Sequence, residues 1–151
     1  MKYAVIGSRK PGKKSVERVI KYLDSLTDIE LIVTGGAYGA DTAGMNYAFE
    51  HGIPLTVYAP NATHNSTLCD YLRRNYDKAN IVNTGRGYLE RNTKVVSDSD
   101  IVICTDYGNG TIDSMEKALR QNKPVLVFGE YIRGKYHKRT PNGVTFMKDN
   151  D

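Results

Sequence analysis

The feature that most constrains the fold is a repeated alternation of short apolar strand patterns with helix patterns along 151 residues. The strand patterns are continuous apolar runs, which are typical of parallel strands covered on both faces. We expect strands over residues 2–7, 29–34, 55–58, 81–82, 100–104 and 124–128. Because crossover helices cover both faces of a parallel sheet, the alternation predicts an α/β fold: a single Rossmann-like three-layer domain with a mainly parallel sheet flanked by helices.

Helix patterns fill the intervals between these strands. After Ser15, apolar residues recur at helical spacing up to Leu26, and Gly52 is placed to end a later helix that starts after Gly39. Further helices are expected over residues 68–76, 85–97 and about 111–122. We predict that residues 1–128 form the domain and that 129–151 are a polar extension of it, with Asn142-Gly143 in a small hairpin.

Length and composition restrict the classes of protein. A chain of this length with 40% hydrophobic residues can build one full-sized core but not two ordinary domains. No apolar run approaches the roughly 20 residues that span a bilayer, and the N-terminus lacks a signal-peptide pattern, so we expect no membrane partner and a cytoplasmic location. Cys69 and Cys104 lack the spacing of metal ligands, so neither a metal site nor a disulfide is expected.

Basic residues are concentrated in two segments of a chain whose formal charge is only +4. Such clusters can steer phosphates toward a site, or they can simply be a solvated surface. Because no recognised nucleic-acid module accompanies them, we do not expect a nucleic-acid partner. The two clusters are Lys2, Arg9, Lys10, Lys13 and Lys14, and Arg133, Lys135, Lys138 and Arg139.

The strongest indication of function is a glycine-rich junction that reads LIVTGGAYGAD over residues 31–41. A strand, a glycine turn and a helix start in this order gather backbone N–H groups and the positive end of a helix dipole, which suits a phosphate. In open parallel sheets, ligands lie beyond the carboxyl ends of the strands. We therefore predict that the turns at 7–9, 34–41 and 107–111 converge on one nucleotide site.

Each candidate residue in these turns has two possible roles. Gly35, Gly36 and Gly39 would let the backbone approach a phosphate, or would only form a tight turn. Asp41 would hold a ribose hydroxyl or cap the helix, and Thr111 would bind phosphate, cap its helix, or do both. The candidate ligand-binding residues of the turns are Gly7, Ser8, Arg9, Thr34, Gly35, Gly36, Ala37, Gly39, Ala40, Asp41, Gly108, Asn109, Gly110 and Thr111.

Four motifs in order, GSR, VTGGAYGAD, the RN pair at Arg91-Asn92 and GNGT, resemble the SLOG superfamily over about residues 2–128. This superfamily includes DprA, Lonely Guy and molybdenum cofactor carrier proteins, and the pattern is most similar to its YspA-like, YpsA-related branch. The resemblance implies a Rossmann-like fold, a nucleotide or nucleotide derivative as ligand with no required cofactor, and a homo-oligomer, a dimer or tetramer. It also implies a ligand-binding role for Arg91 and Asn92, whereas a mid-helix arginine is usually a solvated residue.

One departure from the family bears on catalysis. The Lonely Guy motif GGxGTxxE places a catalytic glutamate three residues after the threonine, and this chain has Ser114 there. A serine cannot replace that carboxylate. We therefore predict a protein that binds a nucleotide or a nucleotide-derived signal, with NAD-derived nucleotides among the candidates, as sensor, carrier or sequestering protein. The alternative is a nucleotide N-glycoside or phosphoribosyl hydrolase with a rearranged acid, either Glu90, Asp98 or Asp113.

Two further hypotheses complete the interpretation. A role on single-stranded DNA, as in DprA, is disfavoured by the modest charge and the absence of a stacking pattern. The polar segment 60–78 is either an ordinary loop or a lid over the crevice that would grip a base or a second phosphate. The lid hypothesis rests on His64, Asn65, Tyr71, Arg73 and Arg74.

Overall fold

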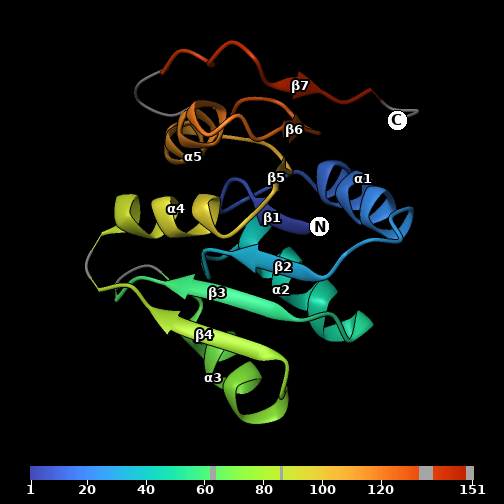
Figure 1. Cartoon of the computed structure of the whole chain (residues 1–151), viewed down its shortest axis with the longest axis vertical. Coiled ribbons are helices and arrows are strands. Elements are labelled where there is room, and N and C mark those ends of the chain that lie inside the picture. Colours follow the sequence, from blue (N-terminus) through green and yellow to red (C-terminus); the bar gives the residue numbers. More distant parts are fainter. Residues whose placement is uncertain (62–63, 86, 133–137, 149–151) are drawn as a thin grey trace.

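The computed structural model describes residues 1–61, 64–85, 87–132 and 138–148 (Figure 1). The strands within these residues are β1 (Lys2–Ile6), β2 (Leu31–Thr34), β3 (Leu55–Ala59), β4 (Ala79–Asn83), β5 (Ile101–Cys104), β6 (Val125–Val127) and β7 (Thr145–Phe146). The helices are α1 (Lys13–Asp24), α2 (Ala40–His51), α3 (Ser66–Asn75), α4 (Tyr88–Ser97) and α5 (Asn109–Arg120).

The strands form one sheet in the order β4-β3-β2-β1-β5-β6-β7, and every pair of neighbours is parallel. The predicted α/β, Rossmann-like fold is confirmed, and the sheet is parallel throughout its described strands. The strand order reverses beside β1, which has β2 on one side and β5 on the other. This reversal is the point at which ligands of such sheets usually bind.

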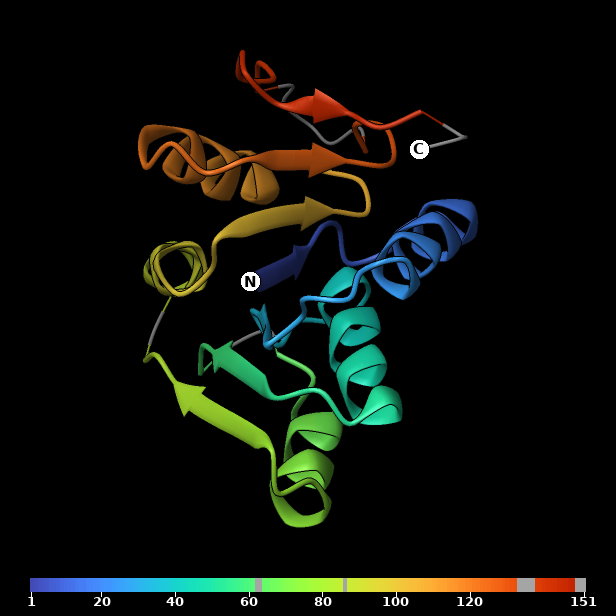
Figure 2. The same cartoon turned by 45° about the vertical axis from the view of Figure 1, so that its right-hand side comes forward.

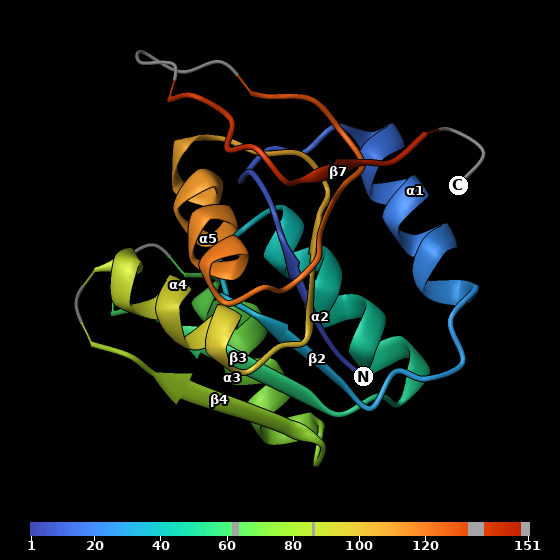
Figure 3. The ribbon, with the colours of Figure 1, turned by 45° about the horizontal axis from the view of Figure 1, so that its top comes forward.

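Three layers result from the period-2 alternation of the strand residues. Tyr3 and Val5 face a core shared with α1, α2 and α3, whereas Ala4 and Ile6 face a second core shared with α4 and α5. Figures 2 and 3 show α4 and α5 on one side of the strands and α1 and α2 on the other. Continuous apolar strands therefore have both faces covered, as the sequence predicted.

The extension beyond residue 128 differs from the predicted hairpin. Asn142 and Gly143 form a turn, but β7 pairs with β6 in parallel, with Leu126 opposite Thr145. Without β7, the edge of β6 would have unpaired backbone N–H and C=O groups, and β7 pairs with them. Its parallel direction differs from the antiparallel pairing of a hairpin. The hairpin prediction is therefore wrong.

Most element bounds agree with the sequence patterns to within a few residues. The helix expected from residue 85 begins at Tyr88, after Gly87, and the strand expected from residue 29 begins at Leu31.

In the described part of the chain, no helix has the length and apolar character that a membrane crossing requires.

Candidate functional site

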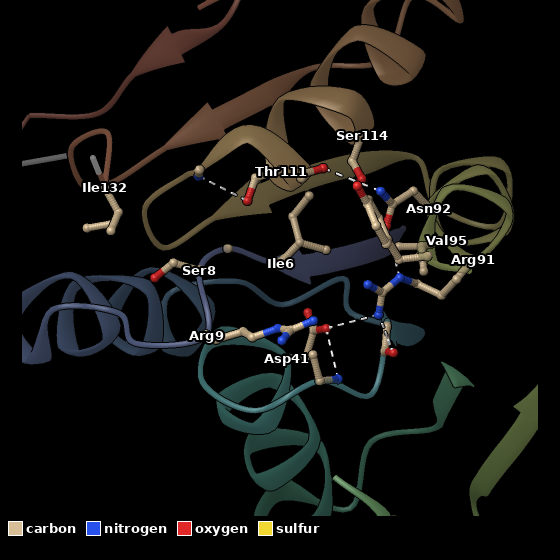
Figure 4. Close-up of a pocket in the computed structure, with 16 residues that line it drawn as sticks. Ile6, Ser8, Arg9, Asp41, Arg91, Asn92, Val95, Thr111, Ser114 and Ile132 are labelled. Carbon is tan, nitrogen blue, oxygen red and sulfur yellow. Dashed lines mark hydrogen bonds and ion pairs between the residues drawn. The ribbon is translucent and has the colours of Figure 1, made fainter. Parts of the chain in front are cut away.

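A pocket of about 400 Å³ lies at the carboxyl ends of β1, β2 and β5, between the starts of α2, α4 and α5 (Figure 4). The turns at 7–9, 34–41 and 107–111 all contribute to it, so the structure brings them together as predicted. The predicted residues that line the pocket are Gly7, Ser8, Arg9, Gly35, Ala37, Asp41, Arg91, Asn92, Gly108, Gly110 and Thr111.

The other predicted residues surround the pocket without lining it. Thr34 is buried at the end of β2, next to Gly36, and its hydroxyl accepts a hydrogen bond from the Gly36 N–H at 3.4 Å. Ala40 donates its N–H to the carbonyl of Ser8 at 3.1 Å, which ties α2 to the β1 turn. Gly39 has φ +82°, and a Cβ there would collide with the Arg9 carbonyl. Asn109 accepts a hydrogen bond from the Tyr131 hydroxyl at 2.7 Å.

An ion pair occupies the glycine turn after β2. Arg91 Nη1 lies 3.6 Å from Asp41 Oδ2 and donates to the Gly35 carbonyl at 2.5 Å. The Ala37 N–H donates to Asp41 Oδ2 at 3.1 Å. A Cβ on Gly35 would lie 2.7 Å from Arg91 Cδ, so only glycine leaves room for this side chain. Asp41 thus braces the turn, and it already engages an amide that the sequence had suggested for phosphate.

Burial dominates the electrostatics of Asp41, which is 6% exposed. Burial raises the pKa of this carboxyl, while the Arg91 guanidinium, the turn N–H groups and the more distant Arg9 act in the opposite direction. Among the described residues that line the pocket, Asp41 is the only acidic one, and Arg9 and Arg91 are the basic ones. The lining therefore carries two guanidinium groups and one carboxyl group.

The β1 turn is held by an aspartate that the sequence analysis missed. Asp106, 1% exposed, accepts hydrogen bonds from the Ser8 N–H at 2.9 Å and the Ser8 hydroxyl at 3.1 Å. Arg9 follows on the exposed side of this turn, and no described residue forms a hydrogen bond or ion pair with its guanidinium. The pocket therefore contains one cation in an ion pair, Arg91, and one, Arg9, that forms neither a hydrogen bond nor an ion pair with a described residue.

The start of α5 forms the opposite wall. The Thr111 hydroxyl accepts a hydrogen bond from the Gly108 N–H at 3.3 Å, so the capping role expected for Thr111 is present. Asn92 Nδ2 donates to the Gly110 carbonyl at 3.3 Å and to Asp113 Oδ2 at 3.2 Å, which fixes α4 against α5. The N-terminus of α5 and its positive dipole end consequently lie at the pocket.

Five lining residues were absent from the sequence-based set: Ile6, Tyr88, Val95, Ser114 and Ile132. Helical spacing could have identified three of them. Tyr88 and Val95 stand three residues before and four after Arg91, and Ser114 stands three after Thr111. An acid directly after a buried strand was the available signal for Asp106. Ile132 follows an irregular segment, where no periodicity operates.

The acids considered for a rearranged hydrolase lie outside the pocket lining. Glu90 is exposed on α4, and Asp113 lies 2.8 Å from Lys117 Nζ. Asp98 lies 3.6 Å from Lys2 Nζ, near the amino ends of β1 and β5. None of the three residues is among those that line the pocket.

The residues of the lid hypothesis also lie outside the pocket lining. Asn65 caps α3 by accepting the Leu68 N–H at 3.2 Å. Tyr71 packs edge-on against Phe49, and Arg73 lies 2.7 Å from Asp70. The segment therefore packs on α2 and within α3, and the Asn65 N–H also donates to the Gly36 carbonyl of the glycine turn at 2.7 Å. The lid hypothesis stays a prediction. Thr63 of the same segment lies outside the described residues.

The remaining sequence hypotheses concern metals and charge. In the described ranges, no three His, Cys, Asp or Glu side chains gather as a metal site. Cys69 and Cys104 are both buried free thiols. In the second basic cluster, Lys138 lies 3.6 Å from Glu116, whereas Arg133 and Lys135 lie outside the described residues.

Solved structures share this architecture. The DprA of Helicobacter pylori, described for its single-stranded DNA binding mode, matches with a TM-score of 0.68 and 23% identity over 85% of this chain and 65% of that one. The DprA of Streptococcus pneumoniae matches with a TM-score of 0.71 and 21% sequence identity, over 97% of this chain and 58% of that one. A molybdenum cofactor binding protein of Rippkaea orientalis matches with a TM-score of 0.66 and 17% sequence identity, over 97% of this chain and 88% of that one.

These likenesses show the fold, and the chain spans less than two thirds of either DprA chain. No curated protein matches the sequence. The model of the SLOG cluster4 family matches residues 1–150, and the chain belongs to this family.

Proposed function

We propose that the protein binds a nucleotide or a nucleotide-derived phosphate ligand in the pocket at the carboxyl edge of the sheet. The observation that carries the proposal is Arg9, a cation that forms no hydrogen bond or ion pair with a described residue, at a pocket that is also lined by the N-terminus of α5. A guanidinium and a helix N-terminus that face one cavity both favour an anion. A volume of about 400 Å³ falls in the usual range for small-molecule sites.

The anion is best accommodated between Arg9 and the start of α5. The glycine turn after β2 is the less favourable place, because the Ala37 amide is engaged by Asp41 and a phosphate there would face that carboxyl group. Asp41 would instead accept a hydrogen bond from a ribose hydroxyl, the role proposed for it from the sequence. The ligand would then extend from an anionic end at Arg9 toward Asp41 and Asn92.

We favour binding over turnover. Among the described lining residues the acidic group is Asp41, which is already bonded to Arg91 and Ala37, and no second carboxyl group accompanies it. General acid–base cleavage of an N-glycosidic bond needs an acid free to face the reacting centre. The proposed role is therefore that of a sensor, carrier or sequestering protein. From the family resemblance we also propose that the protein is a homo-oligomer and that it belongs to the YspA-like branch of the superfamily.

A matched pair of variants tests the proposal. Arg9→Ala removes the lining cation, and Lys10→Ala removes the adjacent exposed cation, which does not line the pocket. We expect at least one of AMP, GMP, CMP and UMP to raise the Tm of the wild type and of Lys10→Ala, but to raise that of Arg9→Ala much less. A set of nucleotides that leaves the wild-type Tm unchanged, or that stabilises all three proteins equally, would contradict the proposal.

Chromatography of each mixture separates binding from hydrolysis. Intact nucleotide after incubation agrees with the binding protein, and free base with ribose 5-phosphate supports the hydrolase. A short single-stranded oligodeoxynucleotide in the same set tests for the single-stranded DNA binding described for the Helicobacter pylori DprA. We expect it to leave the Tm unchanged.

A further inference from the structure

One face of α4 forms a wall of the pocket. Tyr88, Arg91, Asn92 and Val95 follow one another at spacings of three, four and seven residues from Tyr88, which places them on one stripe of the helix. All four line the pocket. The sequence of α4 therefore dedicates a complete helical stripe to this cavity.

Tyr88 differs from the rest of this stripe. Val95 is 1% exposed and Asn92 is 6% exposed, whereas Tyr88 is 48% exposed. Arg91 and Asn92 are held by hydrogen bonds to Gly35 and Gly110, but no described residue forms a hydrogen bond or a ring contact with Tyr88. An aromatic ring that borders a cavity and has no stacking partner offers a free π face to a ligand.

The two ends of the pocket have different chemistry. Figure 4 shows Arg91, Asn92 and Val95 at one end, and Ser8 and Arg9 at the other. The end formed by α4 contains Tyr88, which is the only aromatic residue among the described residues that line the pocket, and the aliphatic Val95. From the opposite end, Arg9 extends its guanidinium toward Asp41, and no described residue forms a hydrogen bond or an ion pair with it. Such a cavity suits a ligand with a planar, weakly polar group at one end and an anion at the other.

We infer that Tyr88 is the stacking platform for the planar heterocycle of the ligand and determines specificity for a base-bearing phosphate over a bare sugar phosphate. This inference rests on the proposed function, because it assumes that the anionic end lies near Arg9. Base–aromatic stacking tolerates every base, since each has a π face, so Tyr88 selects for the presence of a base and not for its identity.

Affinities for two kinds of probe test the inference. The probes are the best-binding nucleoside monophosphate of AMP, GMP, CMP and UMP, and ribose 5-phosphate, which lacks a base. Tyr88→Ala is expected to weaken nucleotide binding about tenfold or more and to leave ribose 5-phosphate binding unchanged. Tyr88→Phe, which keeps the aromatic ring, is expected to bind the nucleotide about as tightly as the wild type. Leu89→Ala is the control, because Leu89 is the adjacent exposed residue of α4, 52% exposed, and does not line the pocket.

A direct optical test uses the absence of tryptophan from the chain. In Tyr88→Trp the introduced indole is the sole tryptophan, and stacking of a base on it quenches its emission. We expect the nucleotide to quench this emission and ribose 5-phosphate to leave it unchanged. Circular dichroism of every variant checks that α4 remains folded.

The outcomes separate the inference from the proposed function. If the nucleotide and ribose 5-phosphate bind the wild type equally, or if Tyr88→Ala weakens both to the same degree, the stacking inference is wrong while phosphate binding stands. If the wild type binds neither probe, both the proposed function and the inference are overturned. An unquenched Tyr88→Trp that binds the nucleotide normally would also overturn the inference.

Discussion

Arg91 of α4 and Asp41 of α2 form an ion pair that links the two helical layers across the carboxyl edge of the sheet, with Nη1 and Oδ2 3.6 Å apart. The two side chains are only 11% and 8% exposed. Because α2 and α4 cover opposite faces, this pair closes the end of the sheet between them. The same pair forms part of the pocket, so the stability of the edge and the shape of the site depend on the same contacts.

Removing Arg91 is expected to destabilise the fold strongly. Arg91→Ala leaves the buried Asp41 without its counter-charge and should lower the free energy of unfolding by about 3 kcal/mol or more. Urea denaturation followed by circular dichroism measures the change. Arg73→Ala is the comparison, because its partner Asp70 is more than half exposed, and its loss should stay below about 1 kcal/mol. Similar losses for the two variants would show that burial does not govern the pair.

A second prediction concerns Gly35, because the Arg91 side chain occupies the space that a Cβ at residue 35 would fill. Gly35→Ala should destabilise the wild type by about 1–3 kcal/mol through overpacking, and should cost much less in an Arg91→Ala background, because the colliding side chain is then absent. A double-mutant cycle from urea denaturation gives the coupling. Gly110→Ala is the control, because a Cβ there meets nothing within 4 Å. A cycle with zero coupling would contradict the steric explanation.

The pairing within the pocket explains which parts of the site the sequence could predict. The strand patterns and turn positions predicted the convergence at 7–9, 34–41 and 107–111, because parallel strands bring their carboxyl ends to one edge. Sequence could not predict that the carboxylate of Asp41 would engage the Ala37 amide, which depends on how far α2 sits from the turn. The local motif is the same whether a ligand or a side chain occupies the turn.

Irregular segments limited the prediction elsewhere. Ile132 and β7 depend on a chain path after residue 128 that has no hydrophobic period, so neither the lining role nor the parallel pairing was predictable. A converse limit came from composition. Tyr71 and Arg73 looked suitable for gripping a ligand, yet the structure has them against Phe49 and Asp70. Residue type indicated the chemistry, but only the packing of α3 determined the direction of these side chains.

The two cysteines are expected to be chemically inert in the folded protein. Burial raises the pKa of both thiols, and Cys69 and Cys104 are 1% and 0% exposed, so little reactive thiolate is present or accessible at neutral pH. A chromogenic disulfide reagent should react slowly with the native protein and rapidly with both thiols in urea. Rapid reaction of either thiol under native conditions would contradict its burial.

The carboxyl group of Asp41 should leave a measurable pH dependence of stability. Burial raises its pKa in the folded chain above the usual value of about 4, so over the window upward from about pH 4 the folded state retains a proton that the unfolded state has lost. Stability contributed by this group therefore falls as the pH rises through that window. Asparagine keeps the shape but does not titrate, so the Tm of Asp41→Asn minus that of the wild type should become more positive with rising pH. Thermal melts of both proteins across the window measure this difference, which removes the contributions of all other titrating groups common to the two. A difference that stays constant, or that becomes more negative, would show that the Arg91 guanidinium outweighs burial at this site.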